Sequence, residues 1–245
     1  MAQRTFGILA GLEIAVGALM WVIHQRSLDQ MLLGFIRKIL VLGLFYAFLS
    51  EFPLWLPNIV RGFEAAGQAA GRTGDLSPSG VMKVGVDLAV RLIKAASDAG
   101  FLLLPVTFLP QLIVLAVLLA YVCIAAQLVM TLVESYLVVA GGVVFLGFAA
   151  FRGSAPLADK YIVYAVQIGV KLFLLYLLVG TGMALTGGWA QELAQLGRPG
   201  ASWQALFDVL AGSLVFALLV WRVPTHASHF LTQNVHVNLR EALAD

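Results

Sequence analysis

The stretch TLVESYLVVAGGVVFLGFAAFRG, residues 131–153, decides what kind of protein this chain is. It closes an apolar segment that begins near residue 101, and it places one carboxylate, Glu134, and two adjacent glycines among aliphatic and aromatic side chains. An ionised carboxylate in hydrocarbon costs about 3 kcal/mol or more. Glu134 therefore needs a charged partner, a wet cavity or an interface with other protein.

The composition of the whole chain is that of a membrane protein. Of its 245 residues, 61% are hydrophobic and 11% are charged, and the mean hydropathy is +0.94. Soluble domains are about half apolar and about a quarter charged. The net charge of +2 does not by itself indicate a nucleic-acid surface, and the single cysteine, Cys123, excludes an internal disulfide. We predict an all-α fold, a polytopic transmembrane helical bundle.

Several segments are long and apolar enough to cross a membrane, since a hydrocarbon core of about 30 Å needs roughly 20 helical residues. About five crossings are predicted, in residues 5–23, 31–49, 101–151, 161–186 and 203–221. The third segment is too long for one ordinary crossing. We predict one long helix that is broken near Gly141 and Gly142, because glycine weakens a helix and membranes tolerate broken helices inside protein. Three crossings within residues 101–151 remain the alternative.

The cationic residues predict the orientation of these helices. They gather after the first segment, before the fourth and after the last: Arg26, Arg37, Lys38, Arg152, Lys160 and Arg222. If these regions face the cytoplasm, the N-terminus lies outside and the C-terminus inside. The chain then divides into two transmembrane helices in residues 1–49, an outer loop in 50–100, a transmembrane core in 101–222, and the start of a cytoplasmic tail in 223–245.

The outer segment contains a predicted amphipathic helix. Ser77 followed by Pro78 is a helix-start signal. Beyond it, charges recur at helical spacing on an apolar body, at Lys83, Asp87, Arg91, Lys94 and Asp98. Such a narrow polar stripe predicts a helix that is largely covered, by the membrane interface, by its own bundle or by another protein. We expect Leu88 to pack and the charged stripe to face outward, toward a partner.

Polar and small residues form stripes on the apolar segments as well, at steps of three and four residues. Lipid cannot satisfy such stripes, so they turn toward protein or a cavity. The predicted intramembrane seam consists of Glu13, Gln127, Thr131, Glu134, Gly141, Gly142, Gln167 and Lys171. Glu134 and Lys171 are candidate partners, either as a structural buried pair or in a wet, substrate-facing seam. Glu13 carries the same ambiguity.

Motifs of soluble enzymes are absent from the sequence. There is no GxxxxGK[ST] nucleotide-binding loop, no HExxH and no GxSxG. His226 and His229 stand three residues apart, but no cysteine or carboxylate completes a metal site. We expect no catalytic residue, no cofactor and no metal. The residues alone leave open a channel, a secondary transporter of a small solute and a purely structural membrane scaffold. A transporter would favour internal repeats, and none is convincing.

Four stretches of the sequence resemble one known family. They are GDLSPSGVMKVGVDL at 74–88, GGVVFLGFAAFRG at 141–153, KYIVYAVQIGVKLFLLYLLVGTG at 160–182 and VWRVP at 220–224. In this order they are similar to the conjugal transfer protein TrbL family, and the resemblance covers nearly the whole chain. The family usually carries a leader before this region and a Gly/Ala-rich tail after it, so we expect the sequence to be part of a longer chain.

The resemblance implies a non-enzymatic, multi-pass component of the bacterial inner membrane that serves a conjugative type IV secretion system as its channel or platform. It implies a homo-oligomeric ring, such as a pentamer, that contacts the minor pilin on the periplasmic side, the major pilin subunit, phospholipid and transferred single-stranded DNA. Separate ATPases supply the energy. A pore that grips DNA needs a basic lining, and only Lys160 and Lys171 lie near the bundle. A platform for pilus assembly is therefore favoured.

Overall fold

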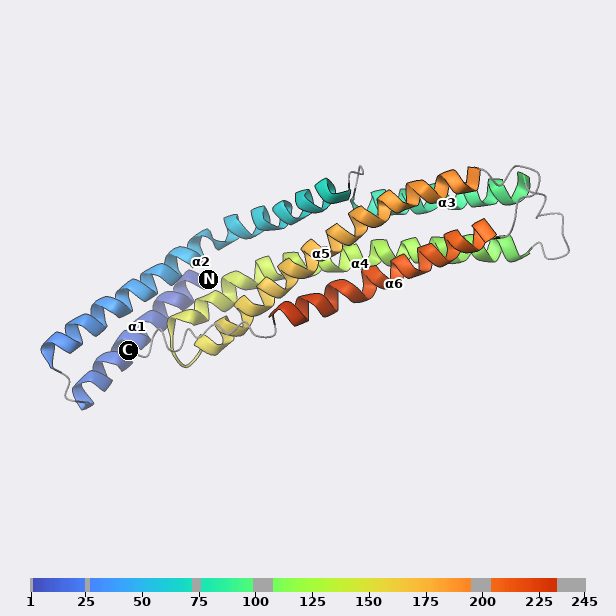
Figure 1. The fold of residues 1–245 in the computed structure, drawn as a ribbon. Helices are drawn as coiled ribbons and strands as arrows, with labels where there is room; N and C mark the ends of the chain where they lie inside the picture. The colour runs from blue at the N-terminus through green and yellow to red at the C-terminus, as the bar shows by residue number, and fades with distance from the viewer. Residues whose placement is uncertain (1, 25–26, 72–75, 99–107, 195–203, 233–245) are drawn as a thin grey trace. The chain divides into compact units, whose positions relative to one another are not determined.

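The computed structural model describes residues 2–24, 27–71, 76–98, 108–194 and 204–232, and these residues form helices and short connections without a strand (Figure 1). The all-α prediction is confirmed. The helices in chain order are α1 (Ala2–Ile23), α2 (Leu28–Gly71), α3 (Pro78–Asp98), α4 (Phe108–Gly147), the short 3-10 helix η2 (Phe148–Ala150), α5 (Ala155–Ala194) and α6 (Gln204–Thr232).

Five helical segments are long and apolar enough to cross a membrane: Gln3–Ile23, Leu28–Glu51, Phe108–Ala150, Ala155–Gln191 and Gln204–Thr232. Each overlaps one of the predicted spans, so the chain is a membrane protein of the predicted class. Parts of the predicted segments, at residues 101–107, 203 and 233–245, lie outside the described residues.

The predicted break at Gly141 and Gly142 is wrong. Helix α4 runs through both glycines without interruption, and it ends at Gly147, where η2 tightens the last turn and Phe151 becomes extended with φ −125° and ψ 129°. A glycine costs about 1 kcal/mol in a helix, which packing on both sides can offset. Because a continuous helix contains no reversal, residues 108–147 make one pass rather than three.

Helix α2 extends past its membrane candidate. It continues to Gly71, so residues 52–71 are helical where the sequence analysis placed the beginning of an outer loop. The stretch EAAGQAAG at 64–71 contains four alanines, and alanine has the highest helix propensity of all residues. No proline follows Pro57 in this helix to interrupt it.

The chain divides into two compact units. The first comprises residues 1–60, 134–169 and 229–245. Its apolar core contains four small residues around the α4–α5 turn, which let the backbones approach closely. Beside them, the Tyr161 ring stacks on Phe145 with 5.3 Å between centroids, and the Tyr161 hydroxyl donates to the Val138 carbonyl. The buried core residues are Phe6, Leu42, Leu49, Val138, Leu146, Ala149, Ala150, Ala155, Ala158, Tyr161 and Ile168.

The second unit comprises residues 61–133 and 170–228. Its helices approach one another where an aromatic ring lies over a glycine. On α3, a Cβ added to Gly85 would lie 2.5 Å from the Cβ of Tyr121 on α4. Between α5 and α6, Gly182 faces the Phe216 ring and Gly212 faces the Trp189 ring, in both cases too closely for any side chain at the glycine position.

The hydroxyl of Tyr121 links a third helix, α5, to the contact between Gly85 and Tyr121. It lies 2.8 Å from the hydroxyl of Thr186 on α5, and both side chains are buried. Buried polar groups need a hydrogen-bond partner, because leaving one unpaired costs free energy. Tyr121 therefore joins α3, through Gly85, to both α4 and α5.

Candidate functional site

A fully buried carboxylate, Glu13, lies in the middle of α1 and meets two cations. The ammonium of Lys38 on α2 lies 2.8 Å from Glu13 Oε1. The guanidinium Nε of Arg152 lies 3.1 Å from the same oxygen, and the backbone N–H of Arg152 donates to Glu13 Oε2 at 3.0 Å. We call Glu13, Lys38 and Arg152 the ionic cluster. It joins α1, α2 and the α4–α5 turn, and α1 and α2 lie side by side here (Figure 1).

The amine of Lys38 occupies a space shaped by α1. Only 6% of Lys38 is exposed. A Cβ at Gly17 would collide with its Nζ, so the absence of a side chain at position 17 makes room for the amine. The Trp21 ring lies one turn further along α1, with its centroid 5.8 Å from Nζ. Aromatic faces attract cations by about 0.5–2 kcal/mol, so Trp21 adds to the attraction of Glu13.

The α4–α5 turn holds Arg152 in position. The Ser154 hydroxyl donates to the carbonyl of Phe148 at 2.8 Å, and the Ala155 N–H donates to the carbonyl of Phe151 at 2.8 Å. These bonds fix the backbone on both sides of Arg152. Its N–H and Nε then reach Glu13 together, which a freely moving turn would not allow.

The ionic cluster is arranged as a structural site, and it contains two cations but only one carboxylate. Charged groups inside a membrane segment need partners because hydrocarbon does not solvate them. Glu13 is fully buried and both of its oxygens are used, whereas 27% of the Arg152 side chain is exposed. Two cations therefore share one carboxylate, and one of the two reaches the surface of its unit.

Helix α3 begins as predicted. The Gly80 N–H donates to the Ser77 hydroxyl at 3.0 Å, and the Val81 N–H donates to the Ser77 carbonyl at 3.0 Å, so Ser77 caps the helix that starts at Pro78. This confirms the start signal, in which a serine oxygen satisfies an otherwise unpaired N–H of the first turn.

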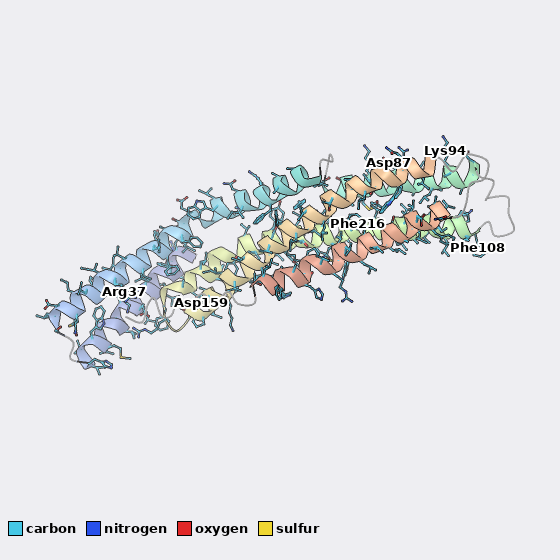
Figure 2. All side chains as sticks on the ribbon, in the orientation of Figure 1. Arg37, Asp87, Lys94, Phe108, Asp159 and Phe216 are labelled. Carbon is cyan, nitrogen blue, oxygen red and sulfur yellow. The ribbon has the colours of Figure 1, made fainter. Side chains whose placement is uncertain are left out.

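Helix α3 has three faces in the structure. One is buried in the second unit and includes Leu88 and Leu92, while Val84 is half-buried. The second carries the charges, and Figure 2 shows Asp87 and Lys94 pointing away from the neighbouring helices. Between these two faces runs an exposed apolar stripe. We call the exposed charges, Lys83, Asp87, Arg91, Lys94 and Asp98, the α3 charged stripe, and the exposed apolar residues are Val86, Val90 and Ile93.

The residues of the predicted seam are distributed over both units. Glu13 belongs to the ionic cluster. Thr131 is buried and donates to the Gln127 carbonyl of its own helix at 3.0 Å. The Gln167 amide nitrogen lies 3.0 Å from His229 Nδ1 on α6, within the first unit. Gly142 is buried, and Gly141, Glu134 and Lys171 are half-buried.

The proposed contact between Glu134 and Lys171 stays a prediction. Glu134 belongs to the first unit and Lys171 to the second. Each has an interaction within the chain, so neither is an isolated charge.

Sequence reasoning missed the role of Lys38 and Arg152. Both were read as orientation signals, because cations near helix ends follow the positive-inside rule. One signal was present, since a carboxylate inside the first span requires a cation and Lys38 lies inside the second. In the described part of the chain, no group of three or more His, Cys, Asp or Glu residues is arranged to hold a metal ion.

Comparison with known proteins identifies the family. A family model described as TrbL/VirB6 plasmid conjugal transfer protein matches residues 10–223. The chain is 26% identical over 190 residues to a conjugal transfer protein TrbL of Rhizobium radiobacter, covering 78% of this chain and 47% of the relative. It is 25% identical over 189 residues to a probable conjugal transfer protein TrbL of Sinorhizobium fredii (strain NBRC 101917 / NGR234), covering 77% and 48%.

The chain thus spans about half the length of the curated relatives it matches. The family match includes every residue of the ionic cluster, the whole of α3 and nearly all of the five candidate spans. The chain belongs to the TrbL/VirB6 family of plasmid conjugal transfer proteins.

Proposed function

We propose that this chain is a non-enzymatic platform subunit of a bacterial conjugative type IV secretion system, located in the inner membrane. The observation that carries the proposal is the family match over residues 10–223, which covers all or most of each of the five candidate membrane spans. The subunit forms a homo-oligomeric ring with the N-terminus in the periplasm and the C-terminus in the cytoplasm. Its ring supports pilus assembly and the transfer of single-stranded DNA or protein, with energy from separate ATPases.

A platform role suits the charge distribution better than a tight DNA channel does. A groove that tracks single-stranded nucleic acid is lined by cations. Five of the described cations are engaged elsewhere: Lys38 and Arg152 hold Glu13, and Lys83, Arg91 and Lys94 lie on the exposed side of α3. Contacts with the major pilin and with phospholipid are part of the same proposal.

The test uses a host in which the gene of this protein is deleted and the full-length chain is supplied again. Conjugation frequency and pilus-dependent phage sensitivity are measured in parallel. A platform subunit is required for both, so the deletion should abolish both and the full chain should restore both. Loss of transfer with normal pili would favour a channel role, and normal transfer in the deletion strain would refute the proposal.

The α3 charged stripe is the proposed docking surface for the minor pilin. Its charges are exposed, and Leu88 and Leu92 on another face of the helix are buried in the second unit. Exposed charges mainly tune encounter and specificity rather than stability. The combined changes Lys83→Glu, Arg91→Glu and Lys94→Glu should therefore reduce co-purification of the pilin while the protein's own oligomer persists.

The matched control for this reversal is Arg61→Glu, an exposed cation on α2 outside the stripe. It should leave pilin binding unchanged. If the triple variant binds the pilin as well as the wild type does, the stripe is only a solvated face and the docking proposal fails.

A further inference from the structure

We propose that Arg152 binds a phosphate group, and that this phosphate is the headgroup of an anionic phospholipid. The inference rests on the phospholipid contact of the proposed function and assigns it to one residue, and its test does not use conjugation as the readout. It starts from the charge balance of the ionic cluster, in which one carboxylate faces two cations. In a medium of low dielectric constant an uncompensated cation is unfavourable, so a second anion beside the cluster would stabilise it.

The free edge of the Arg152 guanidinium is suited to such an anion. Its hydrogen bonds to Glu13 use the backbone N–H and Nε. Neither terminal Nη atom donates a hydrogen bond to another described residue, and 27% of the Arg152 side chain is exposed. Arginine binds phosphate with two parallel N–H donors. One edge of the guanidinium can therefore hold Glu13 while the other holds a phosphate.

The place of Arg152 in the chain favours a lipid as the source. Residue 152 lies in the short link between the candidate spans Phe108–Ala150 and Ala155–Gln191, where a chain leaves and re-enters the membrane. Basic sites between membrane helices bind anionic headgroups. The link also lies just before the N-terminus of α5, and the partial positive charge of the helix dipole at that end adds to the attraction for an anion near the link.

The charged neighbours of Arg152 along α5 do not remove this excess. Asp159 and Lys160 are the next charged residues and carry opposite charges. With these two residues added to the ionic cluster, the formal charges are three positive and two negative, so the net charge around the turn remains positive.

The experiment measures the midpoint of thermal unfolding of the purified full-length protein in mild detergent. Phosphatidylglycerol, phosphatidylcholine and inorganic phosphate are added in separate arms. Phosphatidylglycerol should raise the midpoint of the wild type more than phosphatidylcholine does, and Arg152→Gln should lose this difference. Because each variant is compared with itself in two lipids, destabilisation through the lost Glu13 contact does not affect the readout.

Two further variants sharpen the result. Arg152→Lys keeps the charge without the planar donor edge and should retain part of the lipid-dependent shift. Arg91→Gln, on the exposed side of α3, should retain all of it. If inorganic phosphate reproduces the Arg152-dependent shift, the phosphate site stands and free phosphate is its source. If no arm depends on Arg152, the proposal is wrong.

Discussion

The most specific contacts between helices differ in kind between the two compact units. In the first, a buried carboxylate gathers cations from α2 and from the α4–α5 turn. In the second, aromatic rings lie over glycines, as Phe216 does over Gly182 and Trp189 does over Gly212. Lipid tails are as apolar as leucine, so helices in a membrane gain little from burying apolar area against one another. Beside the apolar packing present in both units, specific association then uses charge in the first unit and close fit between rings and glycines in the second.

The difference predicts opposite weaknesses. A contact built on charge fails when one partner is removed, because the remaining charge stays buried. A contact built on shape fails when an atom is added, because interiors are close-packed and have no spare volume. Substitutions that delete or add a few atoms can therefore distinguish the two kinds of contact experimentally.

The largest effect is expected from Glu13→Gln, which leaves Lys38 buried without its carboxylate. Removing one partner of a buried pair costs about 3–5 kcal/mol. The free energy of unfolding, measured by denaturant titration in mixed micelles, should fall by that order. Glu51→Gln, at an exposed acid on α2, is the control and should change it by less than about 0.5 kcal/mol.

A double variant sharpens this prediction. Adding Lys38→Met to Glu13→Gln removes the more deeply buried of the two cations that lose their carboxylate, and it should recover part of the lost stability. If the double variant is less stable than the single one by the full additive amount, then the two residues act separately and the charge-based account of the first unit is wrong.

An intermediate effect is expected from Gly182→Ala, because the new Cβ would overlap the Phe216 ring. Overpacking of this kind costs about 1–3 kcal/mol. The control lies on the same helix: Gly187 has no neighbouring atom within 4 Å of an added Cβ. Gly187→Ala should therefore stabilise the helix slightly, by up to about 1 kcal/mol. Two glycines of one helix should thus respond with opposite signs, and equal responses would contradict the shape-based account.

The smallest effect is expected from Tyr121→Phe, which removes the hydroxyl that meets Thr186. Thr186 keeps a bond to the Gly182 carbonyl of its own helix at 3.2 Å, so it is not left unpaired. Interhelical hydrogen bonds in membrane proteins average about 0.6 kcal/mol. Tyr136→Phe, at an exposed ring, should change stability less. A loss of several kcal/mol at Tyr121 would show that polar bonding, and not shape alone, holds the second unit.

The membrane spans and the start of α3 were predictable because their signals are local. Hydrophobic length defines a span within about 20 residues, and the Ser77 cap acts within one turn of its helix. The contact between Glu13 and Arg152 joins residues 139 positions apart. The sequence offers several cations that could pair with Glu13, and nothing in hydropathy or spacing selects Arg152 among them.

The error at Gly141 and Gly142 has a physical reason of its own. Glycine lowers helix propensity, but it does not remove a hydrogen-bond donor as proline does. A Cβ at Gly141 would lie 3.7 Å from the Phe145 ring and 3.8 Å from the Tyr161 ring, which are ordinary contact distances. The surroundings thus support a regular helix through this pair, and the chain turns only after Gly147.

Gly17 has a consequence for how this family can change in evolution. The amine of Lys38 fills the space that a side chain at position 17 would need. A substitution at position 17 alone displaces the amine from Glu13, whereas a shorter or apolar residue at position 38 opens the space. We therefore expect the two positions to co-vary among relatives: those that keep a lysine at the equivalent of 38 should keep a glycine at the equivalent of 17. Relatives without that lysine should accept alanine or larger residues there.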